Sequence, residues 1–500
     1  MPTATRRPNA EKNLYSRRDF LRKIGSGSTL LALSQLTANR VMAGPNRSDA
    51  AAGRLYNEKY RPQFHFTPQK NWTNDPNGLV YYKREYHMFF QHNPTGIDWG
   101  NMTWGHAVST DLIHWKQLRN AIEPDELGTI FSGSAVVDWN NTSGFQTGAE
   151  NVLVAFYTSA GAHAQVKVPF TQSIAYSNDR GRTWTKYKDN PVIKHIRGQN
   201  RDPKVIWHEP TKTWIMALYL DKDDFALLCS KNLKEWTVLQ ELKLPGSSEC
   251  PDFFELSVDG EPENTRWVFW GANGRYLLGY FDGHKFSAES GPHESRVGNF
   301  YAAQTYSDIP ESDGRRIQIA WMAGGKFPEM PFNQQMSIPC ELMLRKFPKG
   351  IRLCRVPVRE IAKLRSLKYS LKNAPLPAGQ NASSYLSAEL FEIQAEIELG
   401  TASEVGFTLR GNDLVYSVDE NTLSCRGQKM KMAPANGRIR LTILTDRTSI
   451  EVFCPDSWMT MHLCFPLDPD NTSLELFARG GQAEIRSLKL WTLKSIWPGG

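Results

Sequence analysis

The chain lacks the features that would place it in a membrane or supply it with a cofactor. Beyond residues 1–43, no apolar run reaches the roughly 18 residues needed to span a bilayer. The sequence also has no phosphate-binding loop, no cofactor motif and no spaced cluster of metal ligands. We therefore expect no membrane span, no cofactor and no resident metal.

Cysteine is scarce as well. The chain has seven cysteines, an odd number, and no two of them have the C-x-x-C spacing of a zinc or redox site. This argues against a disulfide framework, and we expect most of these side chains to be small buried apolar groups. The seven are Cys229, Cys250, Cys340, Cys354, Cys425, Cys454 and Cys464.

The chain also has little net positive charge once its amino terminus is set aside. The net charge is +7, but residues 1–43 hold eight Lys or Arg against two acidic residues. The remainder of the chain therefore carries about +1, which gives no basic surface for a polyanion. We expect no nucleic-acid partner.

Residues 1–43 themselves resemble a bacterial export signal. The segment SRRDFLR (16–22) precedes a weakly apolar stretch, 24–36, and the small-residue end Val41-Met42-Ala43. Its SRRxFL core is similar to the twin-arginine signal, which carries folded proteins across a membrane. We expect a bacterial protein that is exported to the periplasm, the cell surface or the medium. The alternative is a disordered basic tail.

The 500 residues are too many for one ordinary core, so two domains are expected. Residues 57–355 consist of short apolar strands separated by turn residues, with almost no helical periodicity. Within them a polar turn that ends in an aromatic residue recurs at Trp115, Trp184, Trp236 and Phe286, at intervals of 69, 52 and 50 residues. Such a repeat is typical of propeller blades, and one more blade fits after Phe286. We therefore predict five blades; hairpins of an irregular sandwich are the alternative.

Three acidic residues occupy a similar position in this repeat. Asp75, Asp202 and Glu249 lie 40, 34 and 37 residues before the closing aromatic of their own blade. This places each near the start of the first strand of a blade, and in a propeller that strand lines the central channel. Acidic residues that are distant in sequence would then converge on one pocket.

After Pro357 the pattern changes to strict alternation of apolar and polar residues between Gly, Asn and Asp turns. This predicts an antiparallel β-sandwich over 381–497, preceded by a linker over 356–380 that is rich in Lys, Pro and Ser. The predicted fold is all-β, a five-bladed β-propeller followed by a C-terminal β-sandwich.

The acidic residues stand among six short motifs. They are WTNDPNG at 72–78, FQHNP at 90–94, WGNMTWGH at 99–106, FSGS at 131–134, RDPK at 201–204 and ECPD at 249–252. Each motif alone is weak, but all six in this order resemble glycoside hydrolase family 32, the family of invertases, inulinases and levanases.

The resemblance implies a retaining mechanism with two carboxylates about 5–5.5 Å apart. Asp75 would be the nucleophile, and Glu249 would protonate the leaving oxygen and then activate water. Asp202 would hold sugar hydroxyls and stabilise the cationic transition state, and Arg201 would help to orient it. Substrate-contacting residues would be Asn74, Gln91 and Ser132 as hydrogen-bonding groups and Trp72, Trp99, Phe131 and Trp321 as apolar walls. His106 is expected to be a packed blade residue.

The implied activity is that of a retaining β-fructosidase that hydrolyses terminal β-D-fructosyl linkages in levan or inulin, in sucrose, or in both. A fructosyltransferase of the same fold, a non-catalytic sugar-binding propeller and an inverting glycosidase are the alternatives. The sequence does not choose among the three substrates, although 172–179 and 190–192 resemble exo-acting fructan hydrolases. It also leaves the oligomeric state open.

Overall fold

The computed structural model describes residues 55–379 and 386–497, so the expected signal peptide lies outside the described residues. Regular structure within them is almost wholly β. The exceptions are two short 3-10 segments, η1 (Gly161–His163) and η2 (Arg359–Leu364). Among the described residues, no helix is long and apolar enough to cross a membrane.

Four antiparallel meanders of four strands each follow one another from β1 to β16. The first contains β1 (Asn71–Tyr82), β2 (Glu85–Asn93), β3 (Thr103–Ser109) and β4 (Lys116–Gln117). The second contains β5 (Thr129–Asp138), β6 (Val152–Ala160), β7 (Thr171–Ser177) and β8 (Thr185–Lys186). The third contains β9 (Arg201–His208), β10 (Thr213–Asp221), β11 (Asp224–Ser230) and β12 (Thr237–Lys243). The fourth contains β13 (Asp252–Val258), β14 (Glu261–Trp270), β15 (Arg275–Phe281) and β16 (Phe286–Glu294).

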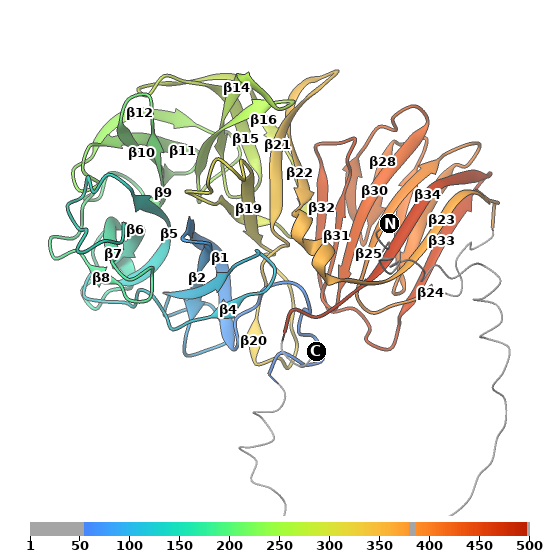
Figure 1. The fold of residues 1–500 in the computed structure, drawn as a ribbon, viewed down its shortest axis with the longest axis horizontal. Coiled ribbons are helices and arrows are strands. Elements are labelled where there is room, and N and C mark those ends of the chain that lie inside the picture. The colour runs from blue at the N-terminus through green and yellow to red at the C-terminus, as the bar shows by residue number, and fades with distance from the viewer. Residues whose placement is uncertain (1–54, 380–385, 498–500) are drawn as a thin grey trace, which may run out of the picture. The chain divides into compact units, whose positions relative to one another are not determined.

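A fifth group of strands closes the ring. It contains β18 (Tyr301–Thr305), β19 (Arg316–Trp321), β21 (Cys340–Phe347) and β22 (Gly350–Pro357). The innermost strands β1, β5, β9, β13 and β18 contact one another in this order, and β18 contacts β1. In addition, β20 (Phe332–Asn333) pairs in parallel with β1, which ties the end of the ring to its start. Figure 1 shows β1, β5 and β9 toward the middle of the ring and β8 and β12 at its edge. This agrees with the predicted five-bladed propeller.

The closing aromatics stand at equivalent positions in four blades. Trp115, Trp184 and Trp236 directly precede β4, β8 and β12, and Phe286 begins β16. Trp184 packs edge-on against Phe89 of the preceding blade at 5.3 Å between ring centroids, and Trp236 packs in the same way on Phe156 at 5.9 Å. Trp184 and Trp236 therefore join neighbouring blades through edge-to-face contacts, whereas Phe286 packs edge-on against Phe253 of its own blade.

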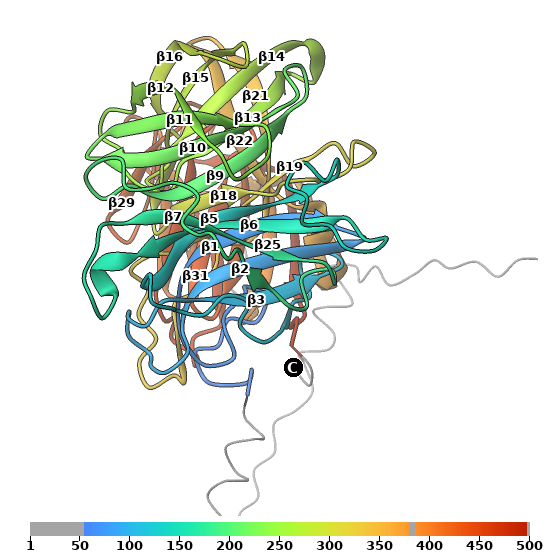
Figure 2. The same cartoon turned by 90° about the vertical axis from the view of Figure 1, so that its left-hand side faces the viewer.

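Two sheets face each other in the C-terminal half and enclose one apolar core. One contains β23 (Arg365–Leu376), β25 (Phe391–Glu398), β30 (Arg438–Asp446), β31 (Ser449–Phe453), β32 (Thr460–Cys464) and β34 (Ala483–Leu493). The other contains β24 (Leu386–Ser387), β26 (Glu404–Leu409), β27 (Asn412–Ser417), β28 (Thr422–Cys425), β29 (Gln428–Lys431) and β33 (Ser473–Arg479). The predicted sandwich is thus confirmed, and Figures 1 and 2 show its strands in orange and red.

The segment expected to be a linker, 356–380, is largely a strand of this sandwich. Here β23 pairs with β34 from Arg365 to Leu376, and only η2 and its flanks connect the two halves. The Lys and Ser residues that suggested a linker lie on an edge strand, where charged side chains protect the open edge of a sheet. The short strand β17 (Arg296–Gly298) leaves the propeller and pairs in parallel with β32 of the sandwich.

Candidate active site

Three propeller blades bring their acidic residues to one place. Asp75 lies within β1, Asp202 is the second residue of β9, and Glu249 lies three residues before β13. The thiol sulfur of Cys250 is 3.5 Å from a carboxylate oxygen of both Asp75 and Asp202. The guanidinium of Arg201 contacts Glu249 and lies 3.7 Å from Asp202. The convergence expected from the repeat is therefore present.

Asp75 is held by two side chains that donate hydrogen bonds to it. Ser132 Oγ donates to one carboxylate oxygen at 2.5 Å, and Asn74 Nδ2 donates to the other at 3.1 Å. Trp72 Nε1 in turn donates to Asn74 Oδ1 at 2.8 Å and fixes the orientation of this amide. Burial raises the pKa of Asp75, and the bonds from Ser132 and Asn74 oppose this effect. The result is a fixed carboxylate that is poorly solvated and therefore reactive.

Asp202 is the most confined of the three acidic residues. Burial raises its pKa to about 7; the charge of Arg201 opposes this shift, whereas the charges of Glu249 and Asp75 add to it. Its backbone N–H donates to Thr158 Oγ1 at 2.9 Å, and the Cys250 N–H donates to its carboxylate at 3.0 Å. Asp202 is therefore a poorly solvated carboxyl group held by the Cys250 N–H and by Arg201.

The acidic residues on the later blades sit on unusual backbone. Asp202 has a φ of 64°, Glu249 of 59° and Cys250 of 38°, all in the left-handed region that residues other than Gly seldom adopt. Such conformations persist only where the surrounding structure enforces them, and they concentrate at functional sites. Here two of the three such residues, Asp202 and Glu249, belong to the acidic cluster.

Glu249 is bound by two donors and remains partly exposed. Tyr301 Oη donates to one of its oxygens at 2.6 Å, and Arg201 contacts the other. Its side chain is 31% exposed, which leaves it accessible to a ligand in the pocket. Arg201 is itself stacked over the Tyr219 ring at 4.7 Å. Sequence reasoning missed Tyr301, because it lies in the fifth blade and outside any acid–Pro corner.

The predicted aromatic residues form two walls around the acidic residues. On one side the Trp321 ring stands edge-on to the ring of Trp72, with 6.1 Å between centroids, and to the ring of Tyr301, with 6.3 Å between centroids. On the other side the Trp99 and Phe131 rings are edge-on, with 5.9 Å between centroids, and Phe131 directly precedes Ser132. A further ring on this side, His163 of η1, was not predicted and contacts Trp99 and Phe131.

Two polar residues named in the sequence analysis make hydrogen bonds within the propeller. Gln91 is buried, and its amide donates to the Ile130 carbonyl at 3.0 Å, so the structure uses it to align neighbouring blades. His106 is packed on Phe89 and hydrogen-bonded to His87, as expected for a blade residue. All seven cysteines are free thiols, and five of them are buried. The described residues contain no group of three or more side chains placed to hold a metal ion.

Comparison with known families covers both halves of the chain. Residues 65–357 match the N-terminal domain of glycosyl hydrolases family 32, and residues 360–492 match its C-terminal domain. The chain belongs to glycosyl hydrolase family 32. As a family 32 glycoside hydrolase it carries its acidic residues within the N-terminal domain, and the second match begins at the 3-10 segment η2.

Individual family 32 proteins are similar over most of the chain. A levanase of Bacillus subtilis (strain 168) is 42% identical over 498 residues, which cover 90% of this chain and 73% of that protein. An extracellular exo-inulinase of Aspergillus niger is 32% identical, over 88% of this chain and 96% of its own. The crystal structure of the exo-inulinase from Aspergillus awamori superposes with a TM-score of 0.80 at 29% identity, covering 88% of this chain and all of that one.

The surroundings of Asp75 and Glu249 differ. Asp75 accepts hydrogen bonds from two neutral donors, Ser132 and Asn74. Glu249 is partly exposed and contacts a cation, Arg201, and a phenol, Tyr301.

Proposed function

We propose that this family 32 hydrolase is a retaining β-fructosidase that releases terminal β-D-fructosyl units from levan, inulin or sucrose. The observation that carries the proposal is the convergence of Asp75, Asp202 and Glu249 from three blades around Cys250. The levanase and exo-inulinase relatives, named for fructan substrates, support this choice of sugar.

In the first step a carboxylate oxygen of Asp75 attacks the anomeric carbon of the fructosyl unit. The bond from that carbon to the glycosidic oxygen breaks as Glu249 gives its proton to the departing oxygen. The products of this step are a fructosyl ester on Asp75, an ionised Glu249 and the free leaving group. Asp202 and Arg201 flank this centre, where a carboxyl group can bind sugar hydroxyls and lower the energy of the cationic transition state.

In the second step a water molecule attacks the same carbon while Glu249 takes one of its protons. The ester bond breaks, Asp75 leaves as the carboxylate, and fructose is released with the configuration of the substrate. The rings of Trp72, Trp321 and Phe131 offer apolar walls to the sugar during both steps. A transferase would use another sugar in place of water, and analysis of the products separates the two activities.

The test compares the chain from residue 44 with its Asp75→Asn and Glu249→Gln variants on sucrose, inulin and levan. We expect fructose release by the wild type, a loss of about 10²–10⁴-fold in kcat for Glu249→Gln, and at least as large a loss for Asp75→Asn. Circular dichroism checks that both variants fold. NMR of the first product anomer should show retention. Inversion, or undiminished turnover in either variant, would contradict the proposed roles.

We also propose that residues 1–43 direct export of the folded enzyme through a twin-arginine route. The support is the SRRDFLR segment and the extracellular exo-inulinase relative. Replacing Arg17 and Arg18 by Lys should retain the enzyme inside a bacterial host, as cell fractionation would show. Unchanged export would exclude this route.

A further inference from the structure

The aromatic wall beside Ser132 continues to the entrance of the active site. It consists of three rings from three segments, Trp99 of the β2–β3 loop, Phe131 of β5 and His163 of η1. The ring centroids are 5.9 Å apart between Trp99 and Phe131, 5.6 Å between Trp99 and His163 and 5.4 Å between Phe131 and His163. We call these three rings the rim cluster. The proposed mechanism gives His163 no role.

Exposure along this wall rises with distance from Asp75. Ser132, which donates a hydrogen bond to Asp75, is buried, and the Phe131 side chain next to it is half-buried. Trp99 is 49% exposed, and His163 is exposed as well. The rim cluster therefore lies on the outer side of the catalytic centre.

The pocket is closed on its inner side. Ser134 and Lys204 follow the site residues of β5 and β9 by two positions, and both are buried. Ser134 Oγ donates to the Pro203 carbonyl at 2.9 Å, and Lys204 Nζ donates to the Thr305 carbonyl at 2.5 Å, so these side chains join inner strands across the propeller. A fructosyl unit bonded to Asp75 therefore has its leaving group on the outer side, toward the rim cluster.

A closed loop holds His163 in the rim cluster. The Gly161 carbonyl accepts hydrogen bonds from the Ala164 N–H at 3.0 Å and from the Val168 N–H at 3.1 Å. A side chain at position 161 would come within 2.5 Å of Val168 Cγ2, so this closure requires glycine. Because β6 pairs with β5 up to its last residue, the loop starts beside the strand that carries Phe131.

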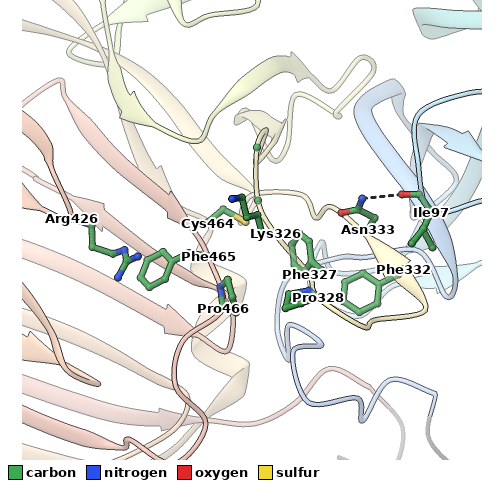
Figure 3. Close-up of a pocket in the computed structure, with 12 residues that line it drawn as sticks. Ile97, Lys326, Phe327, Pro328, Phe332, Asn333, Arg426, Cys464, Phe465 and Pro466 are labelled. Carbon is green, nitrogen blue, oxygen red and sulfur yellow. Dashed lines mark hydrogen bonds between the residues drawn. The ribbon is translucent and has the colours of Figure 1, made fainter.

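Hydrogen bonds to the backbone also fix the segment that carries Trp99. Asn93 Nδ2 donates to the Asp98 carbonyl at 2.8 Å. Asn333 Nδ2 donates to the Ile97 carbonyl, also at 2.8 Å, the bond drawn as a dashed line in Figure 3. Because such bonds already hold both outer segments of the rim cluster, a ligand that binds there has few groups to order.

The rim cluster combines apolar surface with free hydrogen-bonding groups. The ring of a neutral histidine has one donor and one acceptor nitrogen, and the indole of Trp99 has one donor. None of the residues that the structure describes forms a hydrogen bond with the ring of His163 or of Trp99. A sugar offers C–H faces that pack on aromatic rings and hydroxyls that bond to such groups. This combination therefore suits a neutral sugar ring.

We propose that the rim cluster binds the leaving-group sugar, the unit that is joined to the fructosyl unit through the bond that breaks, and that His163 selects this sugar. The inference rests on the proposed function, because it takes a fructosyl unit at Asp75 as given. Trp99 packs on the leaving-group sugar, and His163 forms hydrogen bonds with its hydroxyls. Sucrose, inulin and levan each place a sugar ring here, whereas methyl β-D-fructofuranoside places only a methyl group.

The test compares His163→Phe with the wild type on these four substrates. The variant keeps a ring against Trp99 and Phe131 but removes both nitrogens. It should lower kcat/KM for at least one of sucrose, inulin and levan by about three- to tenfold, the effect of one or two lost hydrogen bonds. It should leave kcat/KM for methyl β-D-fructofuranoside unchanged. This substrate also needs protonation of an alkoxide by Glu249, so unchanged turnover separates lost sugar binding from lost acid catalysis.

The matched control is His284→Phe, which makes the same change at an exposed histidine between β15 and β16. It should change none of the four kcat/KM values, and circular dichroism checks that both variants fold. No loss on any sugar-linked substrate, or an equal loss on the methyl fructoside, would overturn the role of His163 and leave the proposed function standing. If the wild type released no fructose from any of the four substrates, the proposed function would fail and this inference with it.

Discussion

Tyr301 is the side chain nearest to the proposed proton transfer that the sequence motifs do not contain. Its hydroxyl donates to Glu249 Oε2 at 2.6 Å, and its ring stands beside Trp321. Because Arg201 contacts the other oxygen, Tyr301 fixes the rotation of the carboxyl plane relative to the leaving group. It acts through Glu249 and is therefore a positioning residue.

We predict that Tyr301→Phe lowers kcat on sucrose by about tenfold, since one hydrogen bond to a charged group is lost. KM should change little. An aryl fructoside with an acidic phenol as leaving group needs less protonation, so on this substrate the loss should shrink toward twofold or less. Steady-state kinetics on both substrates provide the measurement. An equal loss on both would show that Tyr301 acts on general architecture and not on the acid.

Single site residues could be predicted from the sequence where a short motif marks them. Asp75, Asp202 and Glu249 each precede a proline by one or two residues, at matched positions of a repeat, and the structure brings them together. Tyr301 carries no such signal. The positive φ of Asp202 and Glu249 was equally hidden, because tertiary packing and not local preference imposes it.

A buried ion pair between Lys204 and Asp252 joins inner strands of the propeller. Lys204 of β9 lies 3.6 Å from Asp252 of β13 and donates to the Thr305 carbonyl of β18 at 2.5 Å. Asp252 in turn accepts a hydrogen bond from the Thr305 N–H at 2.6 Å. Three of the five inner strands, two of which adjoin an acidic residue of the site, are thus held in register by one cluster.

We predict that Lys204→Met lowers the free energy of unfolding by about 3–5 kcal/mol, because it leaves the Asp252 carboxylate buried without its cation. The double variant with Asp252→Asn should lose less than the sum of the two single variants. Urea unfolding of the wild type, both single variants and the double variant gives the coupling between the residues. Simple additivity would show that the pair does not interact.

Strands could be predicted from the sequence where each strand pairs with the next one along the chain. The closing aromatics located β4, β8, β12 and β16 because each stands directly before, or at the start of, the last strand of its meander. The partner of β17, by contrast, is β32, more than 160 residues away, and no local pattern reports such a pairing. Composition does not distinguish the edge strand β23 from a linker, because an edge strand and a linker both favour Lys and Ser.

At the scale of the whole molecule, a buried charged network connects the segment before the propeller to the sandwich. His65 Nδ1 lies 2.8 Å from Asp446 at the end of β30, and His65 Nε2 lies 2.7 Å from Glu451 of β31. Glu451 also binds His462 of β32, at 2.8 Å. Burial alone would lower the pKa of His65, but the hydrogen bonds and charges of Asp446 and Glu451 raise it to about 9.

The pKa of Glu451 shifts in the opposite direction. Burial opposes ionisation, yet the bonds from His462 and His65 hold its pKa near 2. A raised histidine pKa contributes stability that is complete below about pH 6.5 and is lost as the pH rises toward 9. A depressed glutamate pKa contributes stability that is complete above about pH 4.5 and is lost as the pH falls toward 2. The contributions of His65 and Glu451 are therefore both complete between about pH 4.5 and 6.5.

We predict that His65→Gln is less stable than the wild type by about 3 kcal/mol near pH 6, and that this difference closes toward pH 9. The difference in stability closes because the wild type loses the charge on His65 over this range, whereas the variant never has it.

The control is His114→Gln, which breaks an exposed pair with Asp111 at 3.0 Å and should change stability by no more than about 1 kcal/mol at any pH. Urea unfolding at half-unit steps of pH gives both differences. A constant difference between wild type and His65→Gln would mean that His65 stabilises the junction by packing alone, whereas a closing one would show that its charge holds the propeller segment to the sandwich.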